Sequence, residues 1–238
     1  MSGSNTAEVE IPQEDILRAD MYDFLASLLR KEPSDALIEE VGRLQGDSSP
    51  IGSACLTLSH LAKTLDNGLI RNEYVTMFIG VGRGEILPFA SYYLTGFLND
   101  KPLANLRADM DAIGIRRAEG VKEPEDHIAS LFDIMSGLIR GRFGRCYSIG
   151  EQATFFRKHI EPWADLLMRD IEAAKTVVFF APVGRIGRAE TKPTTSSLPP
   201  QFRIQGAIEN TTAQAQYRGS REVLGITQYG SQNVTNYY

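Results

Sequence analysis

The densest group of titratable side chains in the sequence is the run EPEDH, residues 123–127. Asp126 and His127 place a carboxylate next to an imidazole, a combination that both general acid–base catalysis and metal binding use. The run does not match the HExxH zinc motif, and a metal site normally needs a third ligand. The remaining histidines, His60 and His159, are not spaced to supply one. One hypothesis is therefore a metal-assisted or acid–base enzyme that uses Asp126 and His127.

The same run can also be interpreted as the start of a helix. Pro124 suits the first turn of a helix, where a missing N–H costs nothing. Its acidic neighbours would lie at the positive end of the helix dipole. His127 precedes Leu131 by four residues, so it lies along the edge of the apolar face and is expected to be a buried, hydrogen-bonded histidine. These residues alone favour the structural interpretation.

A second cluster combines EYVTMFIG at residues 73–80 with PFASYY at residues 88–93. Tyr74, Phe78 and Tyr92 could line an apolar groove with tyrosine hydroxyls at its rim, a surface suited to a peptide. The alternative is that Tyr74 and Phe78, four residues apart on one helix face, pack in the core. The glycine-rich stretch 80–84 lacks both the GxxxxGK[ST] pattern and a preceding strand, so it indicates nucleotide binding only weakly.

Apolar residues recur at helical spacing along the chain up to about Arg188. The clearest case is the segment 128–139, where apolar residues stand at positions 0, 3, 4, 7, 10 and 11. No segment in this region alternates apolar and polar residues between hairpin turns. The pattern predicts an all-α fold, a single-domain helical bundle.

The composition changes from Thr191 onward. Twenty of the final 48 residues are Ser, Thr, Asn or Gln, and three prolines interrupt the start of this segment. No helical period continues through it, as is typical of a chain that builds no packed core. We therefore expect a helical domain over residues 13–188 and a polar, mostly disordered C-terminal tail over residues 189–238.

Composition argues against several other classes of protein. The net charge is −5 and no run of Lys and Arg exceeds two residues, so a nucleic-acid partner is not expected. Cys55 and Cys146 form no CxxC pair, so neither a disulfide scaffold nor a cysteine metal site is expected. This use of cysteine predicts a reducing, cytoplasmic compartment. The first dozen residues hold no apolar segment of a secretory signal, and no apolar stretch approaches the ~20 residues of a membrane span. No cofactor is predicted.

The two clusters together, in their order along the chain, resemble the TorD-like chaperone family (TorD, DmsD and NarJ relatives). The shared pattern is EYxxxFxG at residues 73–80, a proline–serine–tyrosine element that begins at Pro88, and EPxDH at residues 123–127. The later FFxxHIxPWA at residues 155–164 and the segment 179–185 are also similar to that family. The resemblance covers about residues 13–188, and the combination in this order is specific.

This resemblance implies a chaperone, not an enzyme, with a helical bundle of the TorD-like type. Such proteins bind the twin-arginine signal peptide of a molybdenum enzyme and hold the enzyme back from export until its cofactor is inserted. The implied partners are the catalytic subunit of a molybdoenzyme and its signal peptide. Formate dehydrogenase, nitrate reductase and sulfoxide or amine-oxide reductases are all candidate clients. A homodimer is also an open alternative. Matched residue by residue, the peptide-binding positions are Tyr74, Phe78, Gly80, Pro88, Ser91, Tyr92, Glu123, Pro124, Asp126 and His127.

The chemistry of the clusters fits this partner. A signal peptide offers two arginines followed by an apolar stretch, so its acceptor needs an apolar groove flanked by carboxylates. The aromatic cluster could supply the groove, and Glu123, Glu125 and Asp126 the carboxylates, while the acidic body steers a cationic peptide. Because Asp126 lies at a helix start, its replacement is expected to weaken binding without a large loss of stability. The enzyme hypothesis, and a helical scaffold without a peptide groove, remain as alternatives.

Overall fold

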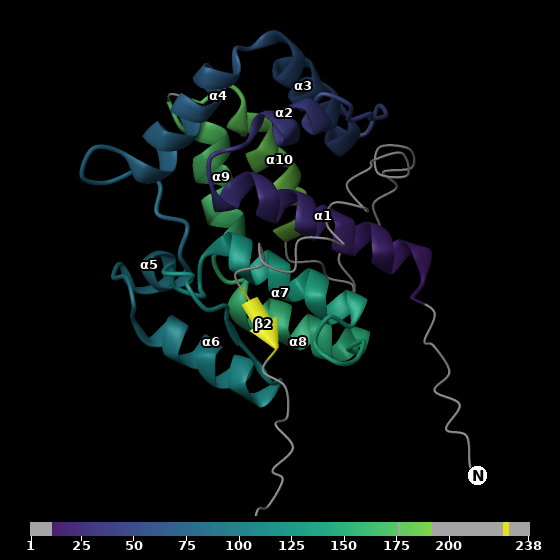
Figure 1. Ribbon diagram of the computed structural model, residues 1–238, viewed down its shortest axis with the longest axis vertical. Coiled ribbons are helices and arrows are strands. Elements are labelled where there is room, and N and C mark those ends of the chain that lie inside the picture. The colour runs from purple at the N-terminus through teal and green to yellow at the C-terminus, as the bar shows by residue number, and fades with distance from the viewer. Residues whose placement is uncertain (1–10, 176, 192–225, 229–238) are drawn as a thin grey trace, which may run out of the picture.

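The computed structural model describes residues 11–175, 177–191 and 226–228, and this part of the chain is almost wholly helical (Figure 1). The predicted all-α class is confirmed. The elements are α1 (Gln13–Arg30), α2 (Asp35–Val41), α3 (Pro50–Thr64), α4 (Asn67–Tyr74), the π-helical turn η1 (Val75–Ile79), α5 (Ala90–Thr95), α6 (Lys101–Ala112), β1 (Ile115–Arg117), α7 (Ile128–Arg140), α8 (Ile149–His159), α9 (Ala164–Ala173), α10 (Phe180–Thr191) and β2 (Ile226–Gln228). None of the helices in these residues is both long and apolar enough to cross a membrane.

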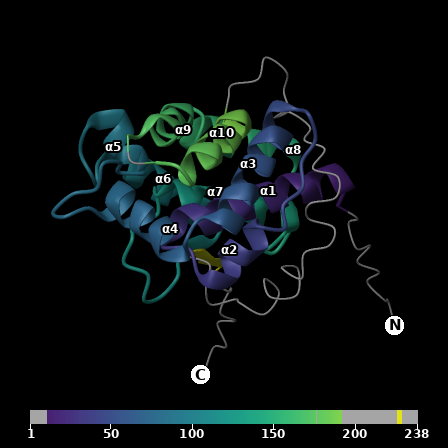
Figure 2. The same ribbon diagram turned by 90° about the horizontal axis from the view of Figure 1, so that it is seen from above.

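Helix α7 is the central helix, and every residue from Ile128 to Ile139 is buried. Figure 2 shows it in the middle of the other helices. A helix that is buried on all sides has no polar face to present to water. Helix α1 packs along α7, where the ring centroids of Tyr22 and Phe132 lie 5.5 Å apart. The polar groups of α7 must therefore find partners inside the protein.

Ion pairs hold α1 against α7. Asp133 on α7 is 5% exposed and pairs with Arg30 of α1, which also donates to the Ala129 carbonyl at 3.1 Å. Burial raises the pKa of Asp133 to about 6, and the nearby Arg30 guanidinium opposes that rise. Removing one partner of such a buried pair typically costs about 3–5 kcal/mol, because the other charge is left uncompensated. Further pairs join Arg140 to Asp20 and Asp23, and Arg142 to Asp23.

Helix α10 packs against both α9 and α3. It needs glycine where it meets α9, since a Cβ added at Gly184 would lie 2.7 Å from the Met168 carbonyl oxygen and one at Gly187 would lie 2.3 Å from the Met168 sulfur. The helical spacing up to about Arg188 predicts helix in this region, but it does not mark α10 off as a separate helix. It ends at Thr191, three residues past the expected domain boundary.

Two short strands form the only sheet among the described residues. Strand β2 pairs antiparallel with β1, with Ile115 opposite Gln228 and Arg117 opposite Ile226. Of the expected polar tail, the structure describes only residues 189–191, which belong to α10, and residues 226–228, which form β2. The expected tail lies otherwise outside the described residues, and the division at residue 188 stays a prediction.

A buried carboxyl group lies in the last turn of α10. Glu190 is 1% exposed, and neither of its carboxyl oxygens has a hydrogen-bond partner among the described residues. Burial raises the pKa of Glu190 to about 8, and Arg18 on α1 opposes the rise. Tyr22, also on α1, has its own pKa raised by burial and next by Glu190. Glu190 is therefore largely protonated at neutral pH.

This raised pKa predicts a stability that falls as the pH rises. The unfolded carboxyl titrates near 4.5 and the folded one near 8, so the native state binds the extra proton between these values. The contribution is fully present below about pH 4.5 and is lost as the pH rises through 8. Glu190→Gln removes the ionisation and should stabilise the protein at pH 9 by on the order of 1–3 kcal/mol, with little change at pH 5.

Thermal melts of the full chain at pH 5, 7 and 9 measure this effect. Glu14→Gln on the exposed start of α1 removes the same charge without burial, and its melting profile should follow the wild type. Parallel pH profiles for wild type and Glu190→Gln would contradict the assignment.

Candidate peptide-binding site

The fold joins the two sequence clusters by a single antiparallel β-bridge between Phe89 and His127. One backbone hydrogen bond runs from the Ala90 N–H to the Asp126 carbonyl oxygen at 3.0 Å. A second runs from the N–H of the first α7 residue to the Pro88 carbonyl oxygen at 2.9 Å. The start of α5 and the start of α7 are therefore fixed to one another.

Asp126 is enclosed at this junction, with no exposed surface. Its Oδ2 accepts a hydrogen bond from the Ser91 N–H at 2.8 Å, which satisfies a backbone donor in the first turn of α5. Phe89, which precedes α5, has no side chain able to cap the helix. The structure therefore contradicts the reason for expecting little loss of stability on replacement of Asp126, because its carboxylate is buried and is an internal acceptor.

His127 is the N-cap of α7. Its Nδ1 accepts a hydrogen bond from the Ala129 N–H at 3.1 Å, so the proton of the neutral ring sits on Nε2. The ring packs edge-on against Phe89, with centroids 5.0 Å apart, and the residue is 4% exposed. Burial, with a smaller contribution from Arg30, lowers the pKa of His127 to about 3. The interpretation as a buried, hydrogen-bonded histidine is confirmed.

These contacts do not form an acid–base pair. The Asp126 carboxylate is directed to α5 and the His127 Nδ1 to the backbone of α7, so neither group activates the other. Among residues 11–175, 177–191 and 226–228, no three His, Cys, Asp or Glu side chains gather as metal ligands would.

Glu125 is also used inside the protein. It is 7% exposed, and its Oε2 accepts hydrogen bonds from the Nε and Nη2 of Arg107 at 3.0 and 2.8 Å. Arg117 lies on its other oxygen at 3.8 Å and also donates to the Glu123 carbonyl at 3.2 Å. Glu125 is therefore not one of the free carboxylates that a peptide would meet. In contrast, the Glu123 side chain is exposed.

The aromatic cluster lies partly in the core. Tyr74 is 4% exposed, and its hydroxyl donates to the Leu29 carbonyl at 3.3 Å. Its ring packs on Phe78 at 4.9 Å and on Phe180 of α10 at 5.8 Å. The core-packing alternative is confirmed for Tyr74, whereas Phe78 is only half-buried and keeps an accessible edge.

Two exposed carboxylates lie close to this cluster. The pKa of Tyr74 is raised first by burial, then by the Glu123 carboxylate, with Glu32 adding to the rise and Arg30 opposing it. Glu32 and Glu123 are both exposed, on the segments that follow α1 and precede α7. Arg30 is paired with Asp133, so its charge is already compensated. The accessible acid at this surface comes from Glu32, which sequence reasoning missed, and from Glu123.

A π-helical turn shapes the edge of the same surface. The Gly80 N–H bonds to the Val75 carbonyl at 2.7 Å, five residues back, and such turns are frequent at functional sites. Gly80 has φ +62°, and a Cβ there would lie 2.1 Å from the Arg83 carbonyl oxygen. The turn and the loop after it leave Ile79 and Val81 exposed, at 55% and 108%.

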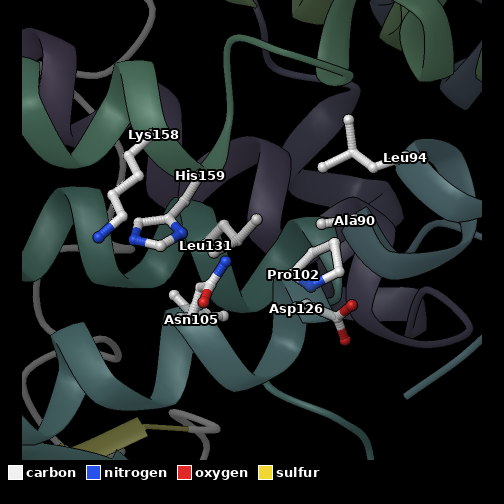
Figure 3. Close-up of a pocket in the computed structure, with 9 residues that line it drawn as sticks. Ala90, Leu94, Pro102, Asn105, Asp126, Leu131, Lys158 and His159 are labelled. Carbon is white, nitrogen blue, oxygen red and sulfur yellow. The ribbon is translucent and has the colours of Figure 1, made fainter. Parts of the chain in front are cut away.

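A small pocket of about 110 Å³ opens on the other side of Asp126, between α5, α6, α7 and α8. Figure 3 shows Leu94 at one end of it, and Lys158 and His159 at the other. The Lys158 Nζ and the His159 Nε2 each lie 2.6 Å from Asp109 Oδ2. Leucine, proline and alanine side chains share the rest of the lining with Asn105 and Asp126, so the pocket presents both apolar and polar groups.

Glu73 has a structural role that the sequence indicated only by its position in the EYVTMFIG cluster. The Glu73 carboxylate accepts hydrogen bonds from the N–H groups of Val178, Phe179 and Phe180, at 3.0, 3.1 and 2.7 Å. It thus caps the start of α10 from more than 100 residues away in the chain, a pairing that only the tertiary fold creates.

The family model described as nitrate reductase delta subunit matches residues 44–169, more than half of the chain. The chain belongs to this family. The prediction of a TorD-like protein is thereby confirmed.

Curated relatives support the same membership. The chaperone protein TorD of Photobacterium profundum is 29% identical over 140 residues, which cover 51% of this chain and 63% of that protein. TorD of Vibrio cholerae serotype O1 is 27% identical over 166 residues, which cover 61% of this chain and 76% of the relative. The match thus spans less than two thirds of the Photobacterium protein. The names of these relatives agree with the prediction of a chaperone rather than an enzyme.

A solved structure also aligns with the chain. The alignment with the crystal structure of a putative redox enzyme maturation protein from Archaeoglobus fulgidus covers 78% of this chain and 97% of the other chain. Its TM-score is 0.47 and the sequence identity is 15%.

The N-cap role of His127 predicts a difference between two substitutions. An asparagine at residue 127 keeps a side-chain oxygen for the cap, so at pH 7 His127→Ala should be less stable than His127→Asn by about 1 kcal/mol. Denaturant unfolding of both variants at pH 7 measures this difference. Equal stability would contradict the cap.

The lowered pKa of His127 predicts a pH dependence. Below pH 6.5 the unfolded histidine takes up a proton, while the folded one stays neutral down to about pH 3. The wild type therefore loses stability as the pH falls, and relative to His127→Asn it should lose up to about 2 kcal/mol between pH 7 and pH 5. Unfolding curves at the two pH values test this, and a constant difference between the proteins would contradict a buried neutral histidine.

Proposed function

We propose that this protein is a chaperone of redox-enzyme maturation that binds the twin-arginine signal peptide of a molybdenum-dependent oxidoreductase and holds the enzyme back until its cofactor is inserted. The observation that carries the proposal is that half-buried Phe78 packs on Tyr74, whose pKa is raised by burial and then by the exposed carboxylates Glu123 and Glu32. Family membership and the chaperone names of the relatives support it.

The two halves of such a peptide match the two kinds of side chain on this surface. Exposed carboxylates accept paired hydrogen bonds from an arginine guanidinium, and Glu32 and Glu123 are not paired in any described contact. Ile79 and Val81 add exposed apolar surface beside Phe78 for the segment that follows the arginines. The pocket beside Leu94, with its mixed apolar and polar lining, offers room for one further side chain.

The ten predicted positions divide into three groups in this proposal. Phe78, Tyr92 and Glu123 would contact the peptide, while Gly80 and Pro124 shape the backbone beside them. The buried members would hold the surface in place; they are Tyr74, Pro88, Ser91, Asp126 and His127.

The client is proposed only as a class. Formate dehydrogenase, nitrate reductase and sulfoxide or amine-oxide reductases share the chemistry that the surface would bind. The peptide must be met before export, so the proposal includes a cytoplasmic site of action. Co-purification from the native cell, followed by identification of the molybdoenzyme subunit, distinguishes these clients.

Titration calorimetry with a client signal peptide tests the arginine contacts. Glu123→Gln and Glu32→Gln should each weaken binding by roughly fivefold, because an exposed charge pair is worth about 1 kcal/mol at most. Added salt should weaken the wild type more than the double variant. Glu119→Gln removes an exposed acid from the same connecting segment and should leave the affinity unchanged. A native peptide that does not bind, or that binds no better than its Lys-Lys variant, would overturn the proposal.

Stability measurements separate contact residues from supporting residues. Glu123→Gln should change the free energy of unfolding by less than about 0.5 kcal/mol, as exposed substitutions usually do. Asp126→Ala should lower it by about 1–3 kcal/mol, because the buried Ser91 N–H loses its acceptor. Equal stability of Asp126→Ala and the wild type would contradict the supporting role.

A further inference from the structure

One arginine of this protein already lies against an aromatic ring at the edge of the proposed peptide surface. Arg83 is exposed, in the connection between η1 and α5 that projects from the helices (Figures 1 and 2). Its guanidinium carbon lies 5.0 Å from the centroid of the Tyr92 ring, and its Nη2 donates to the Tyr92 hydroxyl. A guanidinium over a tyrosine ring at this distance is a cation–π contact.

The ring that holds Arg83 belongs to a rigid aromatic platform. Tyr92 meets the edge of Tyr93 at 6.0 Å, and Tyr93 packs on Trp163 at 5.4 Å. The Tyr93 hydroxyl donates to Asp170 Oδ2 on α9 at 2.7 Å, which fixes α5 to α9. Burial and then the Asp170 carboxylate raise the pKa of Tyr93, so this bond persists at any physiological pH. A platform held in this way loses little entropy when it binds a ligand.

The Arg83 side chain is exposed and can leave the ring without disturbing the helices. Val81 is fully exposed, and a Cβ added at Gly82 would meet nothing within 4 Å. The loop folds back through the hydrogen bond from the Ile86 N–H to the Met77 carbonyl at 2.8 Å, which lies beyond Arg83. Moving the Arg83 side chain off Tyr92 therefore breaks exposed contacts only.

We propose that the face of Tyr92 is a recognition site for a guanidinium group, occupied by Arg83 in the free protein and taken over by an arginine of the bound peptide. The identity of that peptide rests on the proposed function. The exchange replaces one planar guanidinium by another, whereas the compact ammonium of a lysine makes neither the stacked contact nor the fork of donors. Arg83 is then an internal competitor for the Tyr92 ring, and an arginine of the client peptide displaces it more readily than a lysine does.

Two probes test this site with the full chain: a twin-arginine signal peptide, and the blocked dipeptide acetyl-Arg-Arg-amide. Arg83→Gln should bind both probes about two- to fivefold more tightly than the wild type, as the loss of one exposed cation–π competitor implies. Arg43→Gln removes the same charge from the exposed end of the α2 region and should not change either affinity. The gain should vanish for the corresponding lysine probes.

A double-mutant cycle then assigns the gain to the ring. Tyr92→Leu should weaken binding, and adding Arg83→Gln to Tyr92→Leu should give no further tightening. Circular dichroism and melting of each variant check the fold. Should Tyr92→Leu fail to fold, the comparison of Arg83→Gln with Arg43→Gln decides by itself.

The two probes separate the site from the function. Equal binding of the signal peptide by wild type and Arg83→Gln would overturn the guanidinium site and leave the chaperone function standing. The expected pattern with the dipeptide, without binding of any signal peptide, would support the site and overturn the function. Absence of binding for both probes in every variant would overturn both.

Discussion

The bridge between the start of α5 and the start of α7 is the contact on which the rest of this surface depends. An enclosed helix cannot leave its first N–H groups to water, so they need acceptors from the protein. His127 supplies one with its ring nitrogen, and the segment around Pro88 supplies another with its backbone. Asp126 does the same for α5 in return. The order of the two motifs along the chain thus becomes a single junction in space.

This constraint divides the acidic residues into two groups. A buried carboxylate is costly unless hydrogen bonds or a positive partner compensate it. Glu73 and Glu125 meet that condition with backbone N–H groups or arginines, and Asp126 meets it at one oxygen through the Ser91 N–H, so these carboxylates serve the fold. Glu32 and Glu123 remain exposed, and only exposed acids can serve a cationic partner without breaking the fold.

The same division applies to the aromatic residues. The rings of Tyr74 and Phe180 pack together in the core. The neighbouring Glu73 carboxylate accepts the Phe180 N–H and so fixes the start of α10. Tyr92 lies at the margin, where its ring holds the guanidinium of Arg83. A surface for a flexible peptide is thus built on elements whose own positions are fixed by buried polar contacts, which keeps the binding groups preorganised.

The sequence by itself determined the helical class, the central apolar helix at residues 128–139 and the family, because 3.6-residue periodicity and motif order are local properties of the chain. Local pattern also indicated that His127 is buried. It could not identify α10, whose start is capped by Glu73 and whose packing depends on Gly184 against α9. Nor could it distinguish the internal Glu125 and Asp126 from the exposed Glu123, since all three occupy one short run. Only the tertiary structure decided that, because burial and the presence of Arg107 or Ser91 as partners arise from segments distant in sequence.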